Sequence, residues 1–525
     1  MNIFLIFVKN NLIIMLIKTY GSAVYGIKAT TITIEVNATQ GINFFLVGLA
    51  DNAVKESQQR IESALQTNGY RMPGKKVVIN MAPADIRKEG SAYDLPLAIG
   101  ILAASEQIKS NELERCIIMG ELSLDGAIQP VKGALSIALQ AKSEGFTACI
   151  FPKQNAREAA VVDGIEIYGA NNIKEVIDFL DGKESLERVS VDLNAEFLHT
   201  HNYEVDFADV KGQENVKRAM EIAAAGGHNI ILVGPPGAGK TMLSKRLPGI
   251  LPPLTIEEAL ETTKIHSVAG KTGKGAALIT SRPFRSPHHT ISDVALVGGG
   301  SFPQPGEISL AHNGVLFLDE LPEFKRTVLE VMRQPLEDRV ITISRARFAV
   351  EYPASFMLVA SMNPCPCGFY NHPEKKCLCA PGFVQKYLSR ISGPLLDRID
   401  IHIEVVPVPF DKLMLPRVAE PSNVIRERVI QARNIQKERY ADYQGVHCNA
   451  QMNSKMLRKY CVLDSSGHTI MKTAMQKLGL SARAYDRILK VSRTIADMEA
   501  TPTIQAHHLS EAIQYRSLDR EGWGA

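Results

Sequence analysis

The stretch GPPGAGKT at residues 234–241 constrains this 525-residue chain more than any other. The apolar run IILV at 230–233 predicts a buried strand before it, and residues 241–246 predict the start of a helix after it. In that strand-loop-helix context the pattern GxxxxGK[ST] is typical of a loop whose backbone N–H groups cradle phosphates. We therefore predict a nucleotide site rather than a glycine-rich turn that binds nothing. Its binding residues are Gly234, Pro235, Pro236, Gly237, Ala238, Gly239, Lys240 and Thr241.

A second apolar run, at 314–318, predicts a buried strand that ends in two acids, Asp319 and Glu320. In phosphoryl-transfer sites Lys240 would reach the β- and γ-phosphates of ATP, and Thr241 and Asp319 would hold Mg²⁺. Glu320 would position and polarise the attacking water. Because the two motifs contain residues for both the metal ion and the general base, together they predict ATP hydrolysis.

A third predicted strand, at 356–362, ends in Asn363. In AAA+ enzymes a polar residue at this strand end, called sensor 1, orients the water between the acid and the γ-phosphate. The alternative is a turn-forming Asn before Pro364. Residues 206–213, followed by a predicted helix at 216–225, also resemble the start of an AAA+ ATPase core.

Composition limits the class of protein. With 45% hydrophobic and 22% charged residues the chain is an ordinary globular protein, and its length predicts about three or four domains. A net charge of +3 is no global nucleic-acid signature, so any DNA-binding surface must be local. The eight cysteines, four of them crowded between Cys365 and Cys379, indicate a reducing compartment, and we expect a cytoplasmic protein.

The first seventeen residues are apolar enough to test as a targeting segment. Lys9 interrupts the run, no basic region precedes it and no small-residue cleavage site follows it, so we predict no signal peptide or membrane anchor. Met15 is an alternative start, which would make residues 1–14 a spurious upstream extension.

Residues 15–185 mix predicted strands, such as 30–36 and 76–80, with predicted helices, such as 51–66. Their order resembles the proteolytic domain of Lon-type proteases, an α+β fold. In that comparison Ser91 lies only near the position of the nucleophile, and Leu135 takes the place of the catalytic lysine, with Lys132 on a different part of the turn. A serine without its base is not activated. We predict an inactive Lon-like domain kept for assembly or partner binding, followed by a polar linker at 186–206.

Four longer stretches identify a family. They are RPFRSPHHT at 282–290, GGG at 298–300, PGEISLAHNGVLFLDE at 305–320 and SGPLLDRID at 392–400. The chain resembles the magnesium-chelatase-like AAA+ ATPases, and within them the ComM/YifB type. The resemblance implies an α/β protein with a central P-loop αβα core at 207–410 and a C-terminal helical lid at 411–525. It also implies a homohexameric ring that acts in branch migration on branched or single-stranded DNA.

The same resemblance assigns two arginines. Arg398 would be the finger that enters a neighbouring subunit's site, and Arg483 would be sensor 2 of the lid, touching the γ-phosphate. The alternatives are a surface salt bridge of Arg398 with Asp397 or Asp400, and Arg487 as a less favoured sensor.

The roughly seventy residues between the two ATPase motifs exceed the minimal fold, and long insertions are usually functional. Basic residues here and in a predicted hairpin at 339–347 are candidates for contact with a DNA backbone, unless they join subunits. They are Lys271, Lys274, Arg282, Arg285, Arg345 and Arg347. We interpret the adjacent His288 and His289 as structural.

Four cysteines just after Asn363 are paired as Cys365-x-Cys367 and Cys377-x-Cys379. Four thiolates could close a tetrahedral zinc site, although C-x-C is tighter than the usual C-x₂-C spacing. Free thiols are the alternative. Two other functions stay open for the whole chain: a motor that remodels protein partners, and an ATP-dependent Lon-like protease, against which the missing lysine argues.

Overall fold

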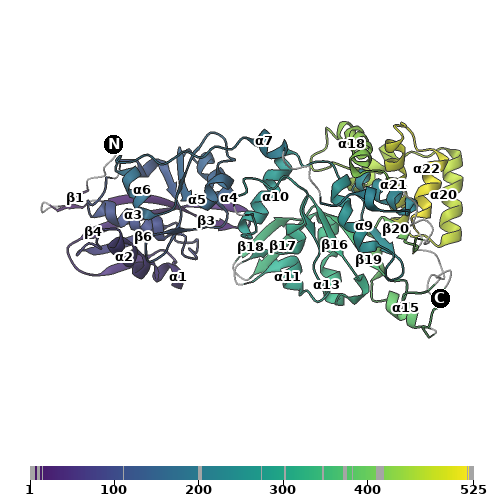
Figure 1. Ribbon diagram of the computed structural model, residues 1–525, viewed down its shortest axis with the longest axis horizontal. Coiled ribbons are helices and arrows are strands. Elements are labelled where there is room, and N and C mark those ends of the chain that lie inside the picture. The colour runs from purple at the N-terminus through teal and green to yellow at the C-terminus, as the bar shows by residue number, and fades with distance from the viewer. Residues whose placement is uncertain are drawn as a thin grey trace. The chain divides into compact units, whose positions relative to one another are not determined.

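The computed structural model describes residues 6–8, 12–14, 16–109, 111–198, 204–273, 275–300, 303–345, 348–370, 375–380, 382–408, 419–516 and 518. The chain forms two compact units (Figure 1). Unit 1 comprises Met1–Thr200 and Ile256–Thr280, and unit 2 comprises His201–Thr255 and Ser281–Ala525.

Unit 1 is built on a mixed seven-stranded sheet of order β11-β10-β7-β3-β4-β6-β5. Its strands are β3 (Leu16–Tyr25), β4 (Lys28–Thr39), β5 (Phe44–Val47), β6 (Lys76–Ala82), β7 (Cys116–Ile118), β10 (Ala148–Pro152) and β11 (Glu166–Ala170). Short pairs β1 (Ile6–Val8) with β2 (Leu12–Ile14), and β8 (Glu121–Leu122) with β9 (Ile128–Gln129), complete its strands. The strands predicted at 30–36 and 76–80 lie within β4 and β6.

The helices of unit 1 cover this sheet with apolar side chains. They are α1 (Asn52–Lys55), α2 (Ser57–Thr67), α3 (Asp94–Ala104), α4 (Ala134–Ser143), α5 (Lys153–Ala159), α6 (Ile173–Leu180), α7 (Leu193–Leu198) and α10 (Ile256–Val268). All eleven residues of α3 are buried, because the helix is apolar except for Asp94, whose carboxylate is paired with Arg60. The helix predicted at 51–66 is divided into α1 and α2 at Glu56.

The segment 256–280 interrupts the sequence of unit 2 but packs within unit 1. Its helix α10 contacts α4, and the buried carboxylate of Glu158 on α5 joins the two. That carboxylate accepts hydrogen bonds from the backbone N–H of Leu135 (2.9 Å) and from the hydroxyls of Ser267 and Thr272. A buried carboxylate needs such donors to offset its lost hydration. Part of the long insertion is thus a structural element of unit 1.

Unit 2 contains a five-stranded sheet of order β13-β16-β19-β12-β20 in which every pairing is parallel. The strands are β12 (Ile230–Val233), β13 (Phe284–Arg285), β16 (Val315–Leu318), β19 (Met357–Met362) and β20 (Ile401–Glu404). Strands β12, β16 and β19 are buried throughout, as expected for apolar runs covered on both faces. Parallel strands present all their carboxyl ends at one edge, which is where the predicted ATPase motifs follow them.

The other elements of unit 2 are mostly short helices around this sheet. Helices of the core are α8 (Glu214–Gly226), α9 (Lys240–Arg246), α11 (Asp293–Val297), α12 (Glu307–Leu310), α13 (Arg326–Val331), α14 (Arg333–Asp338), α15 (Phe383–Leu388) and α16 (Gly393–Leu396). Two hairpins accompany them, β14 (Gly298–Gly299) with β15 (Gln304–Pro305) and β17 (Val340–Arg345) with β18 (Phe348–Pro353). Among the described residues, none of the helices of either unit has the length and apolar character needed to cross a membrane.

The C-terminal part is helical, as predicted. It comprises α18 (Ser422–Arg439), α19 (Ser454–Tyr460), α20 (Ser465–Leu478), α21 (Ala482–Met498) and α22 (Ala506–Gln514). Helices α18 and α21 both pack against α8, so the C-terminal helices share a core with the sheet domain.

Candidate functional site

The carboxyl edge of the parallel sheet gathers the predicted ATPase residues. The phosphate loop follows β12, the two acids follow β16, and Asn363 follows β19. Gly239, at a φ of 89°, caps α9 in a left-handed conformation that glycine adopts without strain. The loop thereby turns directly into a helix whose N-terminus lies at the predicted phosphate position.

Lys240 lies at the centre of this edge. Its buried ammonium donates hydrogen bonds to the carbonyls of Gly234 (2.7 Å) and Pro235 (3.0 Å) and to Oδ1 of Asn363 (3.1 Å). Burial lowers the pKa of Lys240, and the nearby carboxylates of Asp319 and Glu320 only partly oppose this. An anion at this ammonium would be favoured, so the loop fits a phosphate group.

Thr241 and Asp319 meet at the start of α9. The Thr241 hydroxyl donates to Oδ2 of Asp319 at 2.7 Å, and the Ser361 hydroxyl on β19 donates to Oδ1 of the same carboxylate. A hydroxyl and a carboxylate oxygen form the donor set that a magnesium ion takes beside nucleotide phosphates. The residues predicted for Mg²⁺ are therefore adjacent, and Ser361 is an orienting partner that the sequence did not reveal.

Glu320 is one of the few non-glycine residues with a positive φ, 54°, a conformation that costs a residue with a Cβ about 1 kcal/mol or more. Its carboxylate is 56% exposed, and Oε2 lies 3.5 Å from Nδ1 of His289. His289 follows β13, the strand that pairs with β16, and its ring lies on that of His288 with centroids 4.1 Å apart. The structural interpretation of His289 from sequence missed this neighbour, because the pairing of β13 with β16 was not predicted.

Arg398 lies at the opposite edge of the sheet. It precedes β20, which runs parallel to β12, whereas the phosphate loop follows β12. At about 3.3 Å per residue, the four residues of β12 alone separate the two edges by roughly 13 Å. The Arg398 side chain is buried against the carboxylate of Glu337 and the carbonyl of Pro394, rather than against Asp397 or Asp400. It cannot reach the phosphate loop of its own chain.

The two arginines at the start of α21 face this same edge. Nη1 of Arg483 lies 3.3 Å from Oδ2 of Asp397, and the Arg483 side chain is 64% exposed. Nη1 of Arg487 lies 3.1 Å from Oδ1 of Asp400, which is buried. Arg483 thus lies near Arg398 and not near Lys240. Arg487, in contrast, is held in the protein interior by the buried carboxylate of Asp400.

A buried polar network joins the Arg398 loop to the C-terminal helices. Asp400 contacts Nδ1 of His228 at 3.0 Å, and Nε2 of His228 lies 2.8 Å from the hydroxyl of Thr494 on α21. Burial alone would raise the pKa of Asp400, but Arg487 and His228 outweigh it and hold that pKa well below its usual range. The position of Asp400, two residues after Arg398, is therefore fixed by His228, just after α8, and by Arg487 of α21.

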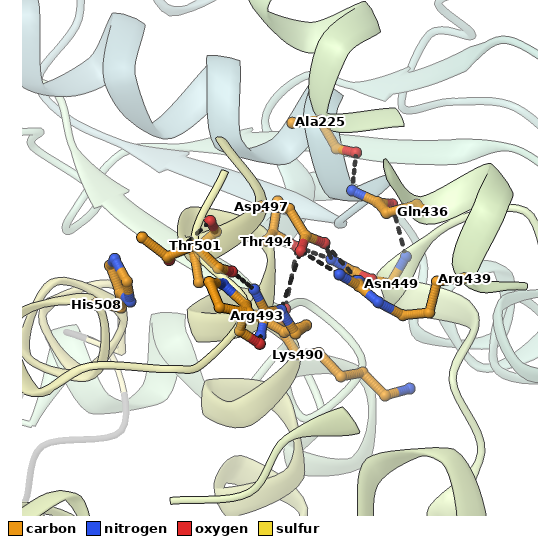
Figure 2. Close-up of polar contacts among 12 residues, drawn as sticks. Ala225, Gln436, Arg439, Asn449, Lys490, Arg493, Thr494, Asp497, Thr501 and His508 are labelled. Carbon is orange, nitrogen blue, oxygen red and sulfur yellow. Dashed lines mark hydrogen bonds and ion pairs between the residues drawn. The ribbon is translucent and has the colours of Figure 1, made fainter. Parts of the chain in front are cut away.

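The same network continues into the lid core (Figure 2). Thr494 also accepts a hydrogen bond from Asn449 (3.0 Å), whose amide donates to Asp497 (2.8 Å). Figure 2 shows Arg439 and Arg493 converging on Asp497, with Arg493 Nε at 3.0 Å from Oδ1. Each buried charge thus has a charged or polar partner, as buried ion pairs require.

Comparison with known proteins agrees with these observations. Three family models match in order: "Subunit ChlI of Mg-chelatase" at residues 34–155, "Magnesium chelatase, subunit ChlI" at 206–413 and "Magnesium chelatase, subunit ChlI C-terminal" at 419–516. The chain is 45% identical over 502 residues to "Uncharacterized protein YifB" of Escherichia coli, covering 95% of this chain and 96% of that protein. It is 44% identical over 504 residues to "Competence protein ComM" of Haemophilus influenzae, covering 95% and 97% respectively.

The chain belongs to the magnesium-chelatase-like ComM/YifB family. It is accordingly an AAA+ ATPase, and the family implies the use of ATP and Mg²⁺. A similarity of 31% identity over 201 residues, 33% of this chain, relates it to "Lon protease 2" of Bacillus subtilis. The predicted fold class, a Lon-like α+β region with a P-loop αβα core and a helical C-terminus, is confirmed.

In the Lon-like region of this ComM/YifB-type chain, Ser91 donates its hydroxyl hydrogen bond to the carboxylate of Glu121. Leu135, where Lon-type proteases carry their lysine, is completely buried on α4. Lys132 is exposed, and its side chain lies beside Gly270. A carboxylate partner does not supply the amine that Ser-Lys chemistry uses.

The basic residues of the insertion and hairpin are placed in part. Arg282 donates to the carbonyls of Pro252 and Asn313, and Arg285 forms a two-point ion pair with Glu307 at 2.6 and 2.8 Å. Both arginines thus have partners within the chain. Lys274, Arg347 and the side chain of Arg345 lie outside the described residues.

The four predicted cysteines of the ComM/YifB-type core lie together, with their Sγ atoms all within 4.8 Å of one another. Cys365 Sγ is 3.3 Å from that of Cys367 and 3.7 Å from that of Cys377, and the last two are 3.5 Å apart. Four sulfurs at about 2.3 Å from one zinc ion would lie about 3.8 Å apart, so the arrangement fits a tetrahedral thiolate site.

A second cluster of potential metal ligands, formed by Glu499, His507 and His508, does not fit a metal ion. Nε2 of His507 and of His508 both lie near Oε2 of Glu499, at 2.9 and 3.0 Å. However, Nδ1 of His508 accepts the backbone N–H of Gln505, which places the ring proton on Nε2. His508 therefore donates to Glu499 and caps α22 instead of offering a lone pair to a metal.

Proposed function

We propose that this AAA+ ATPase is a homohexameric ring motor acting on DNA, with branch migration or helicase activity in recombination or natural transformation, in the cytoplasm. The observation that carries the ring is the position of Arg398, on the sheet edge opposite to Lys240. An ATPase site that needs both residues is complete only between two subunits. The DNA substrate is supported by the similarity to "Competence protein ComM" over nearly its whole length.

The residues at the carboxyl edge of the sheet would carry out hydrolysis. Lys240 and the N–H groups of the phosphate loop would bind the phosphates, and Thr241 with Asp319 would hold Mg²⁺, which would supply positive charge to offset that of the phosphate oxygens. Glu320 accepts a proton from the attacking water and orients it. Asn363, already 3.1 Å from the Lys240 ammonium, is placed to orient the same water from the other side.

Completion of the site would come from a neighbouring subunit. Arg398 exchanges Glu337 for the developing charge on the neighbour's γ-phosphate, as arginine fingers do. Arg483 lies at the same edge, so we assign its sensor role to the neighbour's nucleotide as well. Both arginines would then contact a nucleotide that is bound by the neighbouring subunit.

The domain division belongs to the same proposal: a Lon-like domain at 15–185 without peptidase activity, a linker at 186–206, the ATPase core at 207–410 and the lid at 411–525, with residues 1–14 as an extension. The core bounds include the segment 256–280, which packs within unit 1. The Lon-like domain would serve assembly or partner binding. We also assign a zinc ion to Cys365, Cys367, Cys377 and Cys379 on the geometry of their sulfurs.

The test is the ATPase rate of the purified chain with and without forked or Holliday-junction DNA, together with movement of the branch point. We expect DNA to stimulate hydrolysis and the branch to migrate only with ATP. Lys240→Ala, which keeps the fold but loses the phosphate contact, is the control and should do neither. ATPase activity that no DNA stimulates, with no branch movement, would contradict the DNA proposal.

A second candidate is a motor that remodels protein partners. It is favoured by the match to the "Magnesium-chelatase 38 kDa subunit" of Cereibacter sphaeroides, 23% identical over 177 residues. Stimulation of hydrolysis by a protein partner but not by DNA would favour this candidate. An ATP-dependent protease is disfavoured because Ser91 bonds a carboxylate instead of an amine, and degradation of casein that is lost in Ser91→Ala would reverse that judgement.

A further inference from the structure

The end of β19 and the segment that follows it contact the phosphate loop at three points. The backbone N–H of Gly234 donates to the carbonyl of Met362 at 3.1 Å. Lys240 donates to Oδ1 of Asn363, also at 3.1 Å. Farther along, Gly368 lies directly against the ring of Pro236. Residues 362–368 thus contact the predicted phosphate loop at Gly234, Pro236 and Lys240.

The contact between Gly368 and Pro236 tolerates no side chain. A Cβ on Gly368 would lie 2.4 Å from Cδ and 3.0 Å from Cγ of Pro236, well inside van der Waals contact. Gly368 also has a φ of +82°, which other residues rarely adopt. Its N–H donates to the carbonyl of Cys365 at 3.0 Å, closing a turn that contains Cys365 and Cys367. The surface that supports Pro236 is therefore the back of the thiol turn.

Sulfur atoms connect this turn to the rest of its loop. The N–H of Tyr370 lies 3.3 Å from Sγ of Cys365, and this contact joins residues that are close in sequence. The longer connections run through the sulfurs to Cys377 and Cys379, residues at least ten positions away in the sequence. Thiol–thiol contacts are weak hydrogen bonds, whereas a shared metal ion would fix all four sulfurs.

We propose that a zinc ion held by Cys365, Cys367, Cys377 and Cys379 braces the phosphate loop through the Gly368–Pro236 contact, so that zinc occupancy sets the affinity for ATP. This inference rests on the proposed zinc site and on ATP binding at Lys240. As the zinc–sulfur bonds form, each thiol releases its proton to solvent, and no electron is transferred. A four-thiolate site leaves no open coordination position, so its role is structural.

The proposal predicts an effect on binding rather than on the chemical step. Without the brace, Pro236 loses its support and the phosphate loop must be ordered by the nucleotide itself, whereas Asn363 directly follows β19 and keeps its backbone position. Glu320 and Asp319 follow β16 and keep their backbone positions. Removal of the metal should therefore weaken ATP binding while the bound nucleotide is still hydrolysed.

The first measurement is elemental analysis and ATP titration of the full chain purified under reductant. We expect about one zinc per chain. After chelation the Kd for ATP should rise at least about tenfold, and added zinc, but not added Mg²⁺, should restore it. Absence of zinc, a different metal in its place, or a Kd that does not change when zinc is removed would overturn the proposal.

The second measurement separates the brace from the metal. Gly368→Ala retains all four thiols and should retain zinc, yet its Kd for ATP should rise at least about tenfold. Gly382→Ala is the matched control, because Gly382 has a similar φ of +80° and a Cβ added there would meet nothing within 4 Å, so it carries the backbone cost alone. Equal effects of the two variants on ATP affinity would overturn the contact as the cause.

The two proposals fail in different ways. A chain that binds and hydrolyses ATP equally well with and without zinc contradicts the brace and leaves the ATPase assignment intact. A zinc-loaded chain that binds no ATP, in wild-type form and with Mg²⁺, contradicts the assignment of Lys240 and its loop instead.

Discussion

Glu320 occupies a backbone conformation that few residues adopt, at the end of a strand that is otherwise buried and regular. Its φ of 54° turns the chain away from β16 directly after Asp319, and its carboxylate lies beside His289. Strained backbone at such a position is typical of sites where a side chain must be aimed. The adjacent acids consequently face different partners, Thr241 for Asp319 and His289 for Glu320.

Glu320→Gln should leave ATP bound but largely uncleaved. The amide has the same shape as the carboxylate and can still contact water, but it cannot accept the proton. General-base contributions are about 10² to 10⁴ in rate, so we expect kcat to fall by at least about 10²-fold with the Kd for ATP unchanged. Single-turnover hydrolysis and nucleotide titration measure the two quantities. Unchanged turnover would contradict the assignment of the base.

His289→Ala should lower kcat without changing KM for ATP. His289 is the partner that the structure gives to the Glu320 side chain, and a freed Glu side chain regains rotamer entropy of up to about 2 kcal/mol. Since about 1.4 kcal/mol is tenfold in rate, we expect a loss of up to about tenfold, smaller than that of Glu320→Gln. His288→Ala is the control, because His288 bonds Thr290 instead. A change in KM alone would contradict a positioning role for His289.

Helix α21 carries both exposed and buried charge. Its first turn presents Arg483 to solvent, and its middle buries Lys490, whose ammonium donates to the carbonyl of Ala450 at 2.9 Å. Burial and the nearby Arg487 lower the pKa of Lys490 to about 8, and Asp400 opposes them. The helix thus places an incompletely compensated cation inside the lid, which destabilises the folded state.

Lys490→Met should stabilise the fold near neutral pH. A pKa lowered from 10.5 to about 8 corresponds to a cost of about 3 kcal/mol when the group is protonated, against about 1 kcal/mol for the lost hydrogen bond to Ala450. We expect a net gain of about 2 kcal/mol in the free energy of unfolding of unit 2 at pH 7.

The gain should depend on pH in a defined direction. Below pH 8 the lysine is protonated in both folded and unfolded states, so its full cost is present. As pH rises from 8 toward 10.5 the folded state releases the proton first, and the wild type gains stability. The difference between variant and wild type should therefore shrink by about pH 10 in urea unfolding. A difference that is constant over this range would contradict the account.

The elements that sequence could predict are those whose pattern is local. The strands β12, β16 and β19 lie where apolar runs indicated them, whereas the hairpin predicted at 339–347 contains only β17, and its second strand β18 lies beyond those bounds. Pairing order is not local, and β13, a strand of only two residues, gave no such signal. The approach of His289 to Glu320 depends on that pairing, and so it was missed.

The sequence also could not predict which side chains from different elements would contact each other. Ser361 and Asp319 meet because β19 pairs with β16, and Arg483 meets Asp397 because the lid packs against α8. The packing of 256–280 in unit 1 has the same origin, since Glu158 of α5 accepts from Ser267 and Thr272, and Ala277 and Leu278 join the core of unit 1. In contrast, the cysteine cluster was predictable because its spacing is a local feature.

At the scale of the whole molecule, the parallel sheet divides the ATPase residues into two sets. Lys240, Thr241, Asp319, Glu320 and Asn363 follow strands and share the carboxyl edge, whereas Arg398 and Arg483 lie at the amino edge. The polar network through His228 and Asp400 fixes the second set to the lid. In the proposed ring, each subunit would therefore offer a binding half and a completing half at opposite edges of its sheet, as a closed head-to-tail ring requires.

Mixing two inactive variants tests this arrangement. Lys240→Ala removes the binding half and Arg398→Ala the completing half, so rings of either variant alone should hydrolyse ATP poorly. In mixed rings, an Arg398→Ala subunit that binds ATP can receive Arg398 from a Lys240→Ala neighbour. Random assembly at equal amounts makes about a quarter of the interfaces complete, and we expect about a quarter of wild-type activity.

The control for mixing is the pair Lys240→Ala with the double variant Lys240→Ala/Arg398→Ala, in which no complete interface can form and no activity should return. Size-exclusion chromatography with light scattering should confirm that each variant still assembles, because loss of the ring would also abolish activity. If the first mixture stays inactive although the subunits exchange, Arg398 does not act in trans. In that event its ion pair with Glu337 would be a structural contact within one subunit.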